Sequence, residues 1–254
     1  MLETVEVASY PKSGNTWLSA IISEYCLASF NEQFRIKGIL RSRNEIDAGA
    51  ADLPVNENGT LRIYKSHKRS HQDMTPDRII HIMRHPLDVF FSARNFLYLK
   101  AELGQKHAFN KFIDGKPKTV EQIIQDGELP YYFDEFCEQV GRNYWPGMLG
   151  DESHYFTYIE NALADNRVAT IRYEDLLTQF NNTANVALKH VFGRYYQDTT
   201  IDKELVDKKT KDGNRDKKFF WRAKSGTFKD FLTQQQIDHF YALHESSLKK
   251  LKYL

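Results

Sequence analysis

A run of small and polar residues after the first apolar segment has the composition of an anion-binding loop. The segment Lys12–Thr16 reads Lys-Ser-Gly-Asn-Thr and separates a strand candidate from a helix candidate. Such a turn directs backbone N–H groups outward at the positive end of the helix dipole. Gly14 lets the backbone approach an oxyanion closely, and Ser13, Asn15 and Thr16 add side-chain donors. An ordinary turn would have no reason to gather these residues beside a lysine, so we predict a phosphate site.

The loop is not a Walker A motif. The string GxxxxGK[ST] requires a lysine after its final glycine and occurs nowhere in the chain. Here Lys12 precedes the Ser13-Gly14 pair instead. The missing motif therefore argues against a kinase or other nucleotide hydrolase on a related P-loop fold, which stays an alternative interpretation of the phosphate site.

Two further basic side chains have the chemistry to act on such a ligand. His67 is one of nine histidines, and an imidazole suits the removal of a proton from an alcohol or phenol. The alternative is a plain surface or core histidine. A metal pair with His71 is disfavoured, because no third ligand follows at helical spacing. Arg84 can make bidentate contact with a phosphate, and Ser92 adds a hydroxyl.

A fold must position these residues, and the chain alternates strand and helix patterns, which predicts an α/β class. The apolar run at Arg78–Met83 fits a parallel strand that is buried on both faces. We expect a single domain over residues 1–254 with a P-loop-like, three-layer fold, a central parallel sheet flanked by helices. The other expected strands are Thr4–Ala8, Arg62–Lys65 and Arg167–Arg172, and the expected helices are Gly14–Ser29, one from Pro86, Tyr173–Phe192 and Gln234–Leu251.

Composition narrows the function classes. The 254 residues include 35 Lys+Arg and 34 Asp+Glu, a net charge of +1, which excludes a chain that coats nucleic acid by bulk electrostatics. Cys26 and Cys137 form no zinc-ligand spacing and are interpreted as two reduced thiols. No stretch approaches the roughly 20 apolar residues that span a bilayer, and no signal-peptide pattern opens the chain. We therefore expect a soluble, cytoplasmic protein without a metal.

Two segments have open interpretations. Nine aromatic residues lie between Glu128 and Tyr158; a helical core layer is favoured over the wall of an apolar substrate pocket. The charged run Asp207–Lys218 is interpreted as a solvated loop, and a role as a lid is retained as an alternative.

Four segments in order resemble the sulfotransferases that use 3′-phosphoadenosine 5′-phosphosulfate (PAPS). Tyr10–Trp17 resembles their 5′-phosphosulfate loop, with Asn-Thr where Thr-Thr is commoner. Tyr64–His67, Tyr-Lys-Ser-His, resembles the Lys-Thr-His segment that carries the catalytic base. Arg84–Ser92 resembles the 3′-phosphate motif Arg-Asn-Pro-x-Asp-x-x-x-Ser. Arg172–Leu176 resembles the strand-end segment whose tyrosine meets the adenine.

A fifth segment, Phe219–Lys229, departs from the family pattern Phe-x-Arg-Lys-Gly-x-x-Gly-x-Trp-Lys. Trp221, Arg222 and Ala223 take its Arg, Lys and Gly positions, whereas Gly226 matches. The 3′-phosphate clamp implied here therefore consists of Arg84, Ser92 and Arg222, with Lys224 as a further candidate. This departure also keeps a non-catalytic nucleotide-binding protein as an alternative.

The resemblance implies transfer of a sulfuryl group from PAPS to a hydroxyl, or an amine, of a small or medium acceptor. His67 is then the general base, Lys12 stabilises the leaving phosphate oxygen together with Lys65, and Ser92 restrains the loop lysine. Trp17 and Tyr173 are adenine candidates, although core packing is nearly as good an account of Tyr173. The implied donor-binding residues are Lys12, Ser13, Gly14, Asn15, Thr16, Trp17, Arg84, Ser92, Tyr173, Phe219, Arg222, Lys224 and Gly226.

The acceptor is the part of the function that these motifs leave open. The aromatic stretch hints at an apolar, phenolic or lipid-like alcohol. Loops that vary within one fold build acceptor pockets, so the resemblance concerns the donor.

Overall fold

The computed structural model describes residues 1–34, 36, 51–57, 59–67, 75–105, 111–142, 144–145, 149, 153–212 and 222–254. The chain divides into two compact units. Unit 1 consists of Met1–Arg84 and Ile159–Lys217, and unit 2 of His85–Tyr158 and Lys218–Leu254. The single domain expected over the whole chain stays a prediction. No helix among the described residues is long and apolar enough to cross a membrane.

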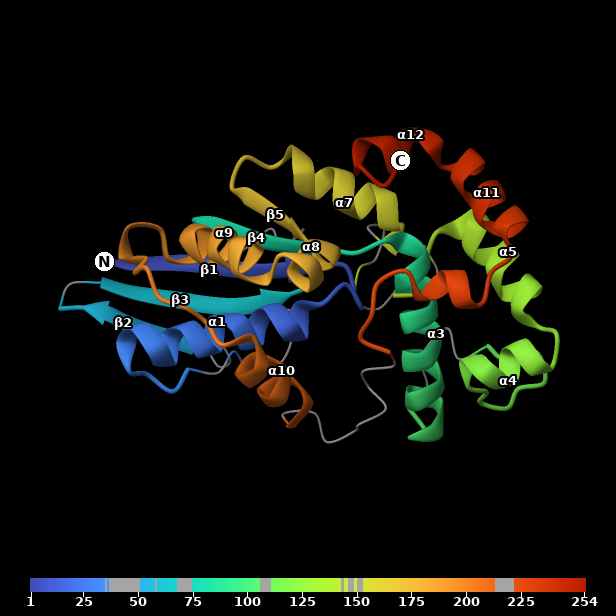
Figure 1. Ribbon diagram of the computed structural model, residues 1–254, viewed down its shortest axis with the longest axis horizontal. Coiled ribbons are helices and arrows are strands. Elements are labelled where there is room, and N and C mark those ends of the chain that lie inside the picture. The colour runs from blue at the N-terminus through green and yellow to red at the C-terminus, as the bar shows by residue number, and fades with distance from the viewer. Residues whose placement is uncertain are drawn as a thin grey trace. The chain divides into compact units, whose positions relative to one another are not determined.

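Unit 1 contains a five-stranded sheet in the order β2-β3-β1-β4-β5 (Figure 1). Four neighbouring strands run parallel, and β2 is added antiparallel to β3 at the edge. The predicted α/β class and central parallel sheet are therefore confirmed. The strands are β1 (Leu2–Ser9), β2 (Ala51–Asn56), β3 (Gly59–Ser66), β4 (Arg78–Met83) and β5 (Val168–Arg172).

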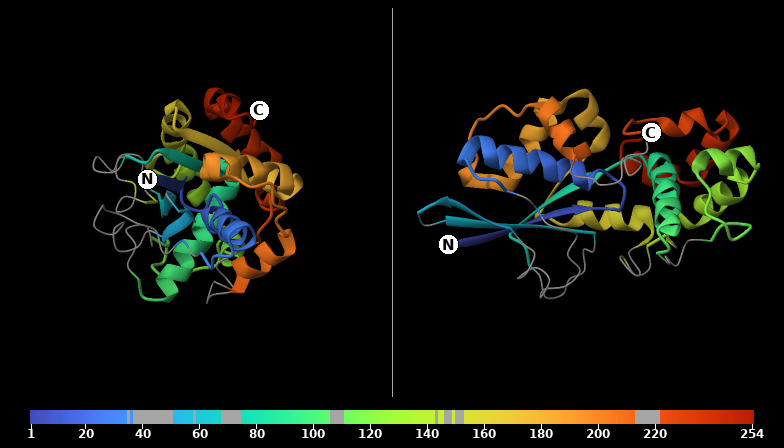
Figure 2. Two further views of the ribbon diagram at one scale, coloured as in Figure 1. Left: turned by 90° about the vertical axis from the view of Figure 1, so that its left-hand side faces the viewer. Right: turned by 90° about the horizontal axis from the view of Figure 1, so that it is seen from below.

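One face of this sheet is covered by the helices α1 (Asn15–Phe30) and α9 (Phe180–Phe192), which lie on the same side in Figure 2. Every second residue of the strands faces them, because side chains alternate along a strand. Val5 and Val7 of β1 and Ile80 and Ile82 of β4 share one buried core with these helices. Burial of this face therefore fixes which side chains of each strand point toward the helices.

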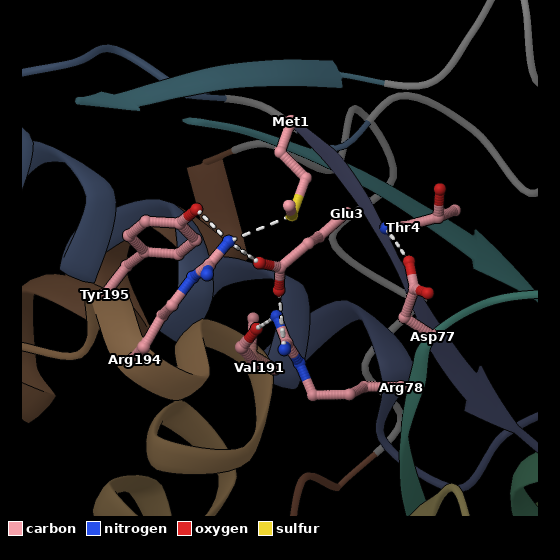
Figure 3. A network of polar contacts seen from close by, with 8 residues as sticks. All are labelled: Met1, Glu3, Thr4, Asp77, Arg78, Val191, Arg194 and Tyr195. Atoms are coloured by element: carbon pink, nitrogen blue, oxygen red, sulfur yellow. Dashed lines mark hydrogen bonds and ion pairs between the residues drawn. The ribbon is translucent and has the colours of Figure 1, made fainter. Parts of the chain in front are cut away.

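The amino end of the sheet is held by a network of ion pairs and hydrogen bonds (Figure 3). The Glu3 carboxylate accepts from Arg78 at 2.7 Å and from Arg194 at 2.6 Å. The Thr4 N–H donates to the Asp77 carboxylate at 2.7 Å. A second N–H of Arg78 donates to the Val191 carbonyl at 3.1 Å, which ties α9 to β4. The network joins segments that lie far apart in the sequence.

Unit 2 is helical in its described part. Its core is aromatic: the Phe90 and Phe136 ring centroids lie 4.9 Å apart, and those of Phe136 and Phe240 5.8 Å apart. Its elements are α3 (Pro86–Glu102), α4 (Val120–Gln125), α5 (Leu129–Gln139), the start of α7 (Tyr155–Ala164), the 3₁₀ turn η4 (Thr227–Asp230), α11 (Gln234–Leu243) and α12 (Glu245–Lys250). Of the nine aromatic residues between Glu128 and Tyr158, all except Tyr131 are buried, so the preference for core is confirmed.

Two expected helices are each divided in two. The helix expected over Tyr173–Phe192 is broken at Gln179, whose backbone has φ −135° and ψ 52°, so that α8 (Tyr173–Thr178) precedes α9. The helix expected over Gln234–Leu251 is broken at His244, whose ring nitrogen contacts the Cys137 carbonyl at 2.8 Å. In both cases the helical sequence pattern continues past the residue at which the backbone leaves the helix.

The prediction of a loop over Asp207–Lys218 is wrong for residues 207–212. Lys203–Asp212 forms helix α10, because Val206 and Thr210 are buried one turn apart and Lys209 pairs with Glu24 of α1. A charged composition hid this buried stripe. Residues 213–218 lie outside the described part of the chain.

Candidate active site

Four of the predicted motifs lie at the carboxyl ends of four neighbouring parallel strands. The loop after Ser9 follows β1, His67 follows β3, Arg84 follows β4 and Tyr173 follows β5. In open parallel sheets this edge is where ligands bind. Because the four strands are parallel neighbours, unit 1 brings these predicted residues to one edge of its sheet.

The loop after β1 is shaped for a ligand that approaches its backbone. Lys12 has φ 71° and Gly14 has φ 112°, both in the left-handed region. A Cβ on Gly14 would lie 2.8 Å from the Tyr173 ring, so a larger residue is excluded by conformation and by space. Gly14 caps α1 without a side-chain hydrogen bond, and the first turn holds no acidic residue. The N–H groups of this turn therefore lack a side-chain cap and suit an anion.

Ser13 provides the clearest sign of a ligand-binding site at the loop. Its side chain is 0% exposed, and its Oγ has no hydrogen-bond partner among the described residues. A buried hydroxyl without a partner is destabilising by about 1–3 kcal/mol. The chemistry of the loop, a hydroxyl beside backbone N–H groups, fits the oxygens of a phosphate.

The side chain of Asn15 makes contacts within unit 1. Its side-chain amide donates to the Val7 carbonyl at 3.3 Å and to Ser9 Oγ at 3.0 Å. Its side-chain oxygen accepts from the Ser19 hydroxyl at 3.3 Å. These contacts tie the loop to β1 and α1, so the side chain holds the loop in shape. Thr16 is half-buried in the first turn of the helix.

His67 is held in one tautomer. Its Nδ1 lies 2.7 Å from the Ser9 carbonyl oxygen and 3.2 Å from Ser9 Oγ. A carbonyl oxygen can only accept, so Nδ1 carries the proton and Nε2 of the neutral ring keeps its lone pair. The side chain is 6% exposed.

The surroundings keep the His67 ring neutral. Burial lowers its pKa to about 4, against the hydrogen bond from the ring to the Ser9 carbonyl. The positive charges of Lys65 and Lys12 lower it further, which places both ammonium groups within electrostatic reach of the ring. A neutral imidazole beside two cations can accept a proton while they stabilise an anion.

The guanidinium of Arg84 connects the loop to the aromatic side of the site. Its Nη1 donates to the Lys12 carbonyl at 3.5 Å, and its Cζ lies 4.6 Å from the centre of the Tyr173 ring. Tyr173 meets Trp17 edge to face at 5.4 Å, and Trp17 packs on Phe180 at 6.0 Å. Trp17 and Tyr173 are both members of the buried core, so packing is part of their role.

The remaining predicted residues belong to unit 2. Ser92 is 8% exposed on α3, whereas Arg222 and Lys224 are exposed. Arg222 pairs with Asp230 at 3.3 Å. Phe219 lies outside the described residues. No group of three metal-ligating side chains occurs in the described part of the chain.

Asp88 is a residue whose role the sequence reasoning missed. It is 1% exposed in the first turn of α3, and it accepts from the Gly226 N–H at 2.7 Å and the Phe228 N–H at 3.4 Å. It therefore fixes the turn that carries Arg222 and Lys224 to the helix that carries Ser92. The signal was its fixed place between Arg84 and Ser92 in the motif.

Comparison with known proteins bears on the fold and the family. A family model described as a sulfotransferase domain matches residues 2–252. No curated protein matches the chain. Mouse sulfotransferase SULT7A1, solved in complex with PAP, matches with a TM-score of 0.57 and 15% identity over 99% of this chain and 85% of its own.

Two structures of retinol dehydratase also match the fold at 15% identity. One is a complex with androsterone and the inactive cofactor PAP, with a TM-score of 0.50 over 97% of this chain and 80% of that one. The other is a complex with retinol and PAP, with a TM-score of 0.51 over 97% and 81%. At this identity the likeness shows the fold, and the family model spans nearly the whole sequence. The chain belongs to the family of PAPS-dependent sulfotransferases.

Proposed function

We propose that this enzyme moves the sulfuryl group of PAPS to a hydroxyl of a small or medium acceptor, with His67 as the general base. The observation that carries the proposal is the Nδ1 contact of His67 with the Ser9 carbonyl, which leaves Nε2 as the basic nitrogen. An amine acceptor and a cytoplasmic location stay predictions.

The loop after β1 is the proposed grip on the 5′ end of the donor. The buried Ser13 hydroxyl and the first N–H groups of α1 are available to oxyanions. Lys12 adds a positive charge at the same turn. PAPS supplies the transferable sulfuryl group, and 3′,5′-adenosine bisphosphate (PAP) is its product.

The proton and charge steps are assigned to three side chains. Nε2 of His67 accepts the acceptor proton while the new S–O bond to the acceptor oxygen forms and the S–O bond to the leaving phosphate breaks. Lys12 and Lys65 stabilise the negative charge that grows on the leaving oxygen. Both cations already act on His67, which supports their place at the same centre. The sulfuryl group carries little charge of its own, so no metal is required.

The proposed 3′-phosphate contact of unit 1 is Arg84. Arg84 presents its guanidinium from the end of β4, against the Tyr173 ring. In unit 2, Ser92, Arg222 and Lys224 stay candidates for a 3′-phosphate from their motif positions. The Asp88 carboxylate accepts from the Gly226 and Phe228 N–H groups, which supports a fixed geometry for the turn that carries Arg222 and Lys224.

The acceptor class is supported by the relatives. The matched retinol dehydratase structures hold androsterone or retinol, which are small apolar molecules with a hydroxyl. We extend this class to the present chain as a proposal.

Calorimetric titration without metal tests the donor assignment. Wild type is expected to bind PAP far more tightly than adenosine 5′-monophosphate, which lacks the 3′-phosphate. The Arg84→Ala variant should lose about 10- to 100-fold in PAP affinity and little in monophosphate affinity, because a bidentate charged contact is removed. Arg62→Ala, which removes an arginine paired with Asp52 on the same sheet, is the matched control. Equal losses for both nucleotides would place Arg84 away from the 3′-phosphate, and binding of ATP only with magnesium would contradict the donor assignment.

A further inference from the structure

Arg94 in α3 is a buried cation that the mechanism does not use. Its side chain is 4% exposed. Among the described residues, neither its Nε nor its Nη2 has a hydrogen-bond partner. Arginine is almost never fully buried unless it is paired, because an unpaired charge loses its hydration. The position therefore requires an explanation.

Aromatic rings surround this guanidinium within unit 2. Its Cζ lies 4.0 Å from the centre of the Tyr132 ring and 5.2 Å from that of the Phe112 ring. Such contacts favour a cation but do not accept its N–H groups as an oxygen would. The Tyr132 hydroxyl accepts from the Ile113 N–H at 2.9 Å. Glu128, which also acts on the pKa of Tyr132, is paired with Lys118 at 2.6 Å.

The two unpartnered nitrogens are the pair with which this chain binds carboxylates elsewhere. Arg62 donates from Nε and Nη2 to the two oxygens of Asp52 at 2.8 and 2.9 Å. Arg167 donates from the same two nitrogens to Asp165 at 3.1 and 2.8 Å. This edge of a guanidinium matches a carboxylate with two parallel hydrogen bonds. At Arg94 no described side chain supplies those oxygens.

A second buried donor without a partner belongs to the aromatic layer of unit 2. Trp145 is 2% exposed, and its Nε1 has no partner among the described residues. Its ring packs on Phe96, two residues after Arg94 on α3, at 5.8 Å. Burial raises the pKa of the neighbouring Tyr144, and the Arg94 charge opposes this, so Arg94 acts on the same layer. An aromatic layer with unsatisfied donors suits a ligand that is apolar in body and anionic at one end.

We propose that the Nε–Nη2 edge of Arg94 binds the carboxylate of an aryl carboxylic acid held in the aromatic layer of unit 2. The inference goes beyond the proposed function, because it is argued from contacts within unit 2 alone. The carboxylate accepts from the two unpartnered nitrogens, and the aryl ring of the ligand packs in the aromatic layer.

Calorimetry with two probes of equal shape tests the proposal on the full chain, with PAP present. The probes are 4-hydroxybenzoate and the uncharged 4-hydroxybenzamide. Wild type is expected to bind the acid at least about tenfold more tightly. Arg94→Met should abolish this preference, and Arg94→Lys should retain only part of it, because lysine lacks the planar fork. Lys100→Met, which removes another cation from α3, is the matched control and should keep the full preference.

Thermal unfolding without ligand distinguishes a binding role from a structural one. Arg94→Met should unfold at the same or a higher temperature than wild type, because the variant no longer buries an unpaired charge. A lower unfolding temperature with the probe preference intact would overturn the proposal, as would equal binding of both probes by wild type. If inorganic sulfate displaces the acid completely, and the aromatic ring of the acid adds no affinity, Arg94 binds anions in general. That result would also overturn the proposal. Failure of the proposed function would show separately, because wild type would then not bind PAP.

Discussion

The two ends of strand β1 in unit 1 differ in how their polar groups are satisfied. At the amino end, Glu3 accepts from both Arg78 and Arg194 (Figure 3). At the carboxyl end, the Ser13 hydroxyl is fully buried without a partner in the described part of the chain, and Lys12 has a positive φ. Paired groups stabilise the fold, whereas strained or unpaired groups persist where a ligand uses them. The difference assigns stability to one end of the strand and donor binding to the other.

The largest expected effect at the carboxyl end comes from His67→Ala. Loss of a general base should reduce the rate of sulfuryl transfer by roughly 10²- to 10⁴-fold. PAP affinity should change little, because the proposed role of Nε2 is toward the acceptor and not toward the donor. The measurement is turnover with labelled PAPS beside a PAP titration. His190→Gln is the matched control, because that imidazole also contacts a carbonyl, Arg167 O at 3.1 Å, at the amino end of β5. Unchanged turnover in His67→Ala would remove it from the mechanism.

The pH dependence of stability should also separate wild type from a His67→Asn variant. The pKa of His67 in the folded protein, about 4, is below the ordinary value of 6.5. Between these values the unfolded state binds more protons, so the free energy of unfolding should fall as the pH is lowered from 6.5 to 4. The variant should lose that part of the slope, measured by urea unfolding at several pH values.

The same pKa predicts the pH profile of activity. The base stays neutral above about pH 4, so kcat/KM should not decline as the pH falls through 6.5. A decline centred near 6.5 that disappears in the variant would show a His67 with an ordinary pKa, contrary to the buried geometry.

At the amino end, Glu3→Gln should affect stability and leave binding unchanged. The substitution removes the charge that joins Arg78 and Arg194, both distant in sequence, and should lower the free energy of unfolding by about 1–3 kcal/mol. The exposed pair of Glu245 with Lys249 supplies the control, because Glu245→Gln should change stability by less than about 0.5 kcal/mol. A weakened PAP affinity in Glu3→Gln would mean that the two ends of β1 are not independent.

Much of the sheet and of the donor motifs could be predicted because both are local patterns. The apolar run of β4 and the loop after β1 are contiguous in the sequence, and parallel order brings their ends to one edge. Edge strand β2 was missed because Pro54 and polar residues interrupt any strand signal. Helix α10 was missed because its two buried positions are hidden among charges.

The details that decide chemistry depend on contacts between distant segments. The tautomer of His67 follows from a carbonyl 58 residues away, and the Asp88 contact with Gly226 spans 138 residues. The inward amide of Asn15 follows from its contacts with β1. A motif names the residue type at such positions, whereas the direction of each side chain follows from the packed fold.

Ser13→Ala tests most directly whether the unpartnered Ser13 hydroxyl after β1 serves the donor. Urea unfolding and PAP calorimetry should be measured on the same variant. Removing a buried hydroxyl without a partner should raise the free energy of unfolding by about 1 kcal/mol, while PAP affinity falls by roughly five- to tenfold. A variant that is less stable and binds PAP as tightly as wild type would show that Ser13 serves the fold, and the contrast between the two ends of the strand would be wrong.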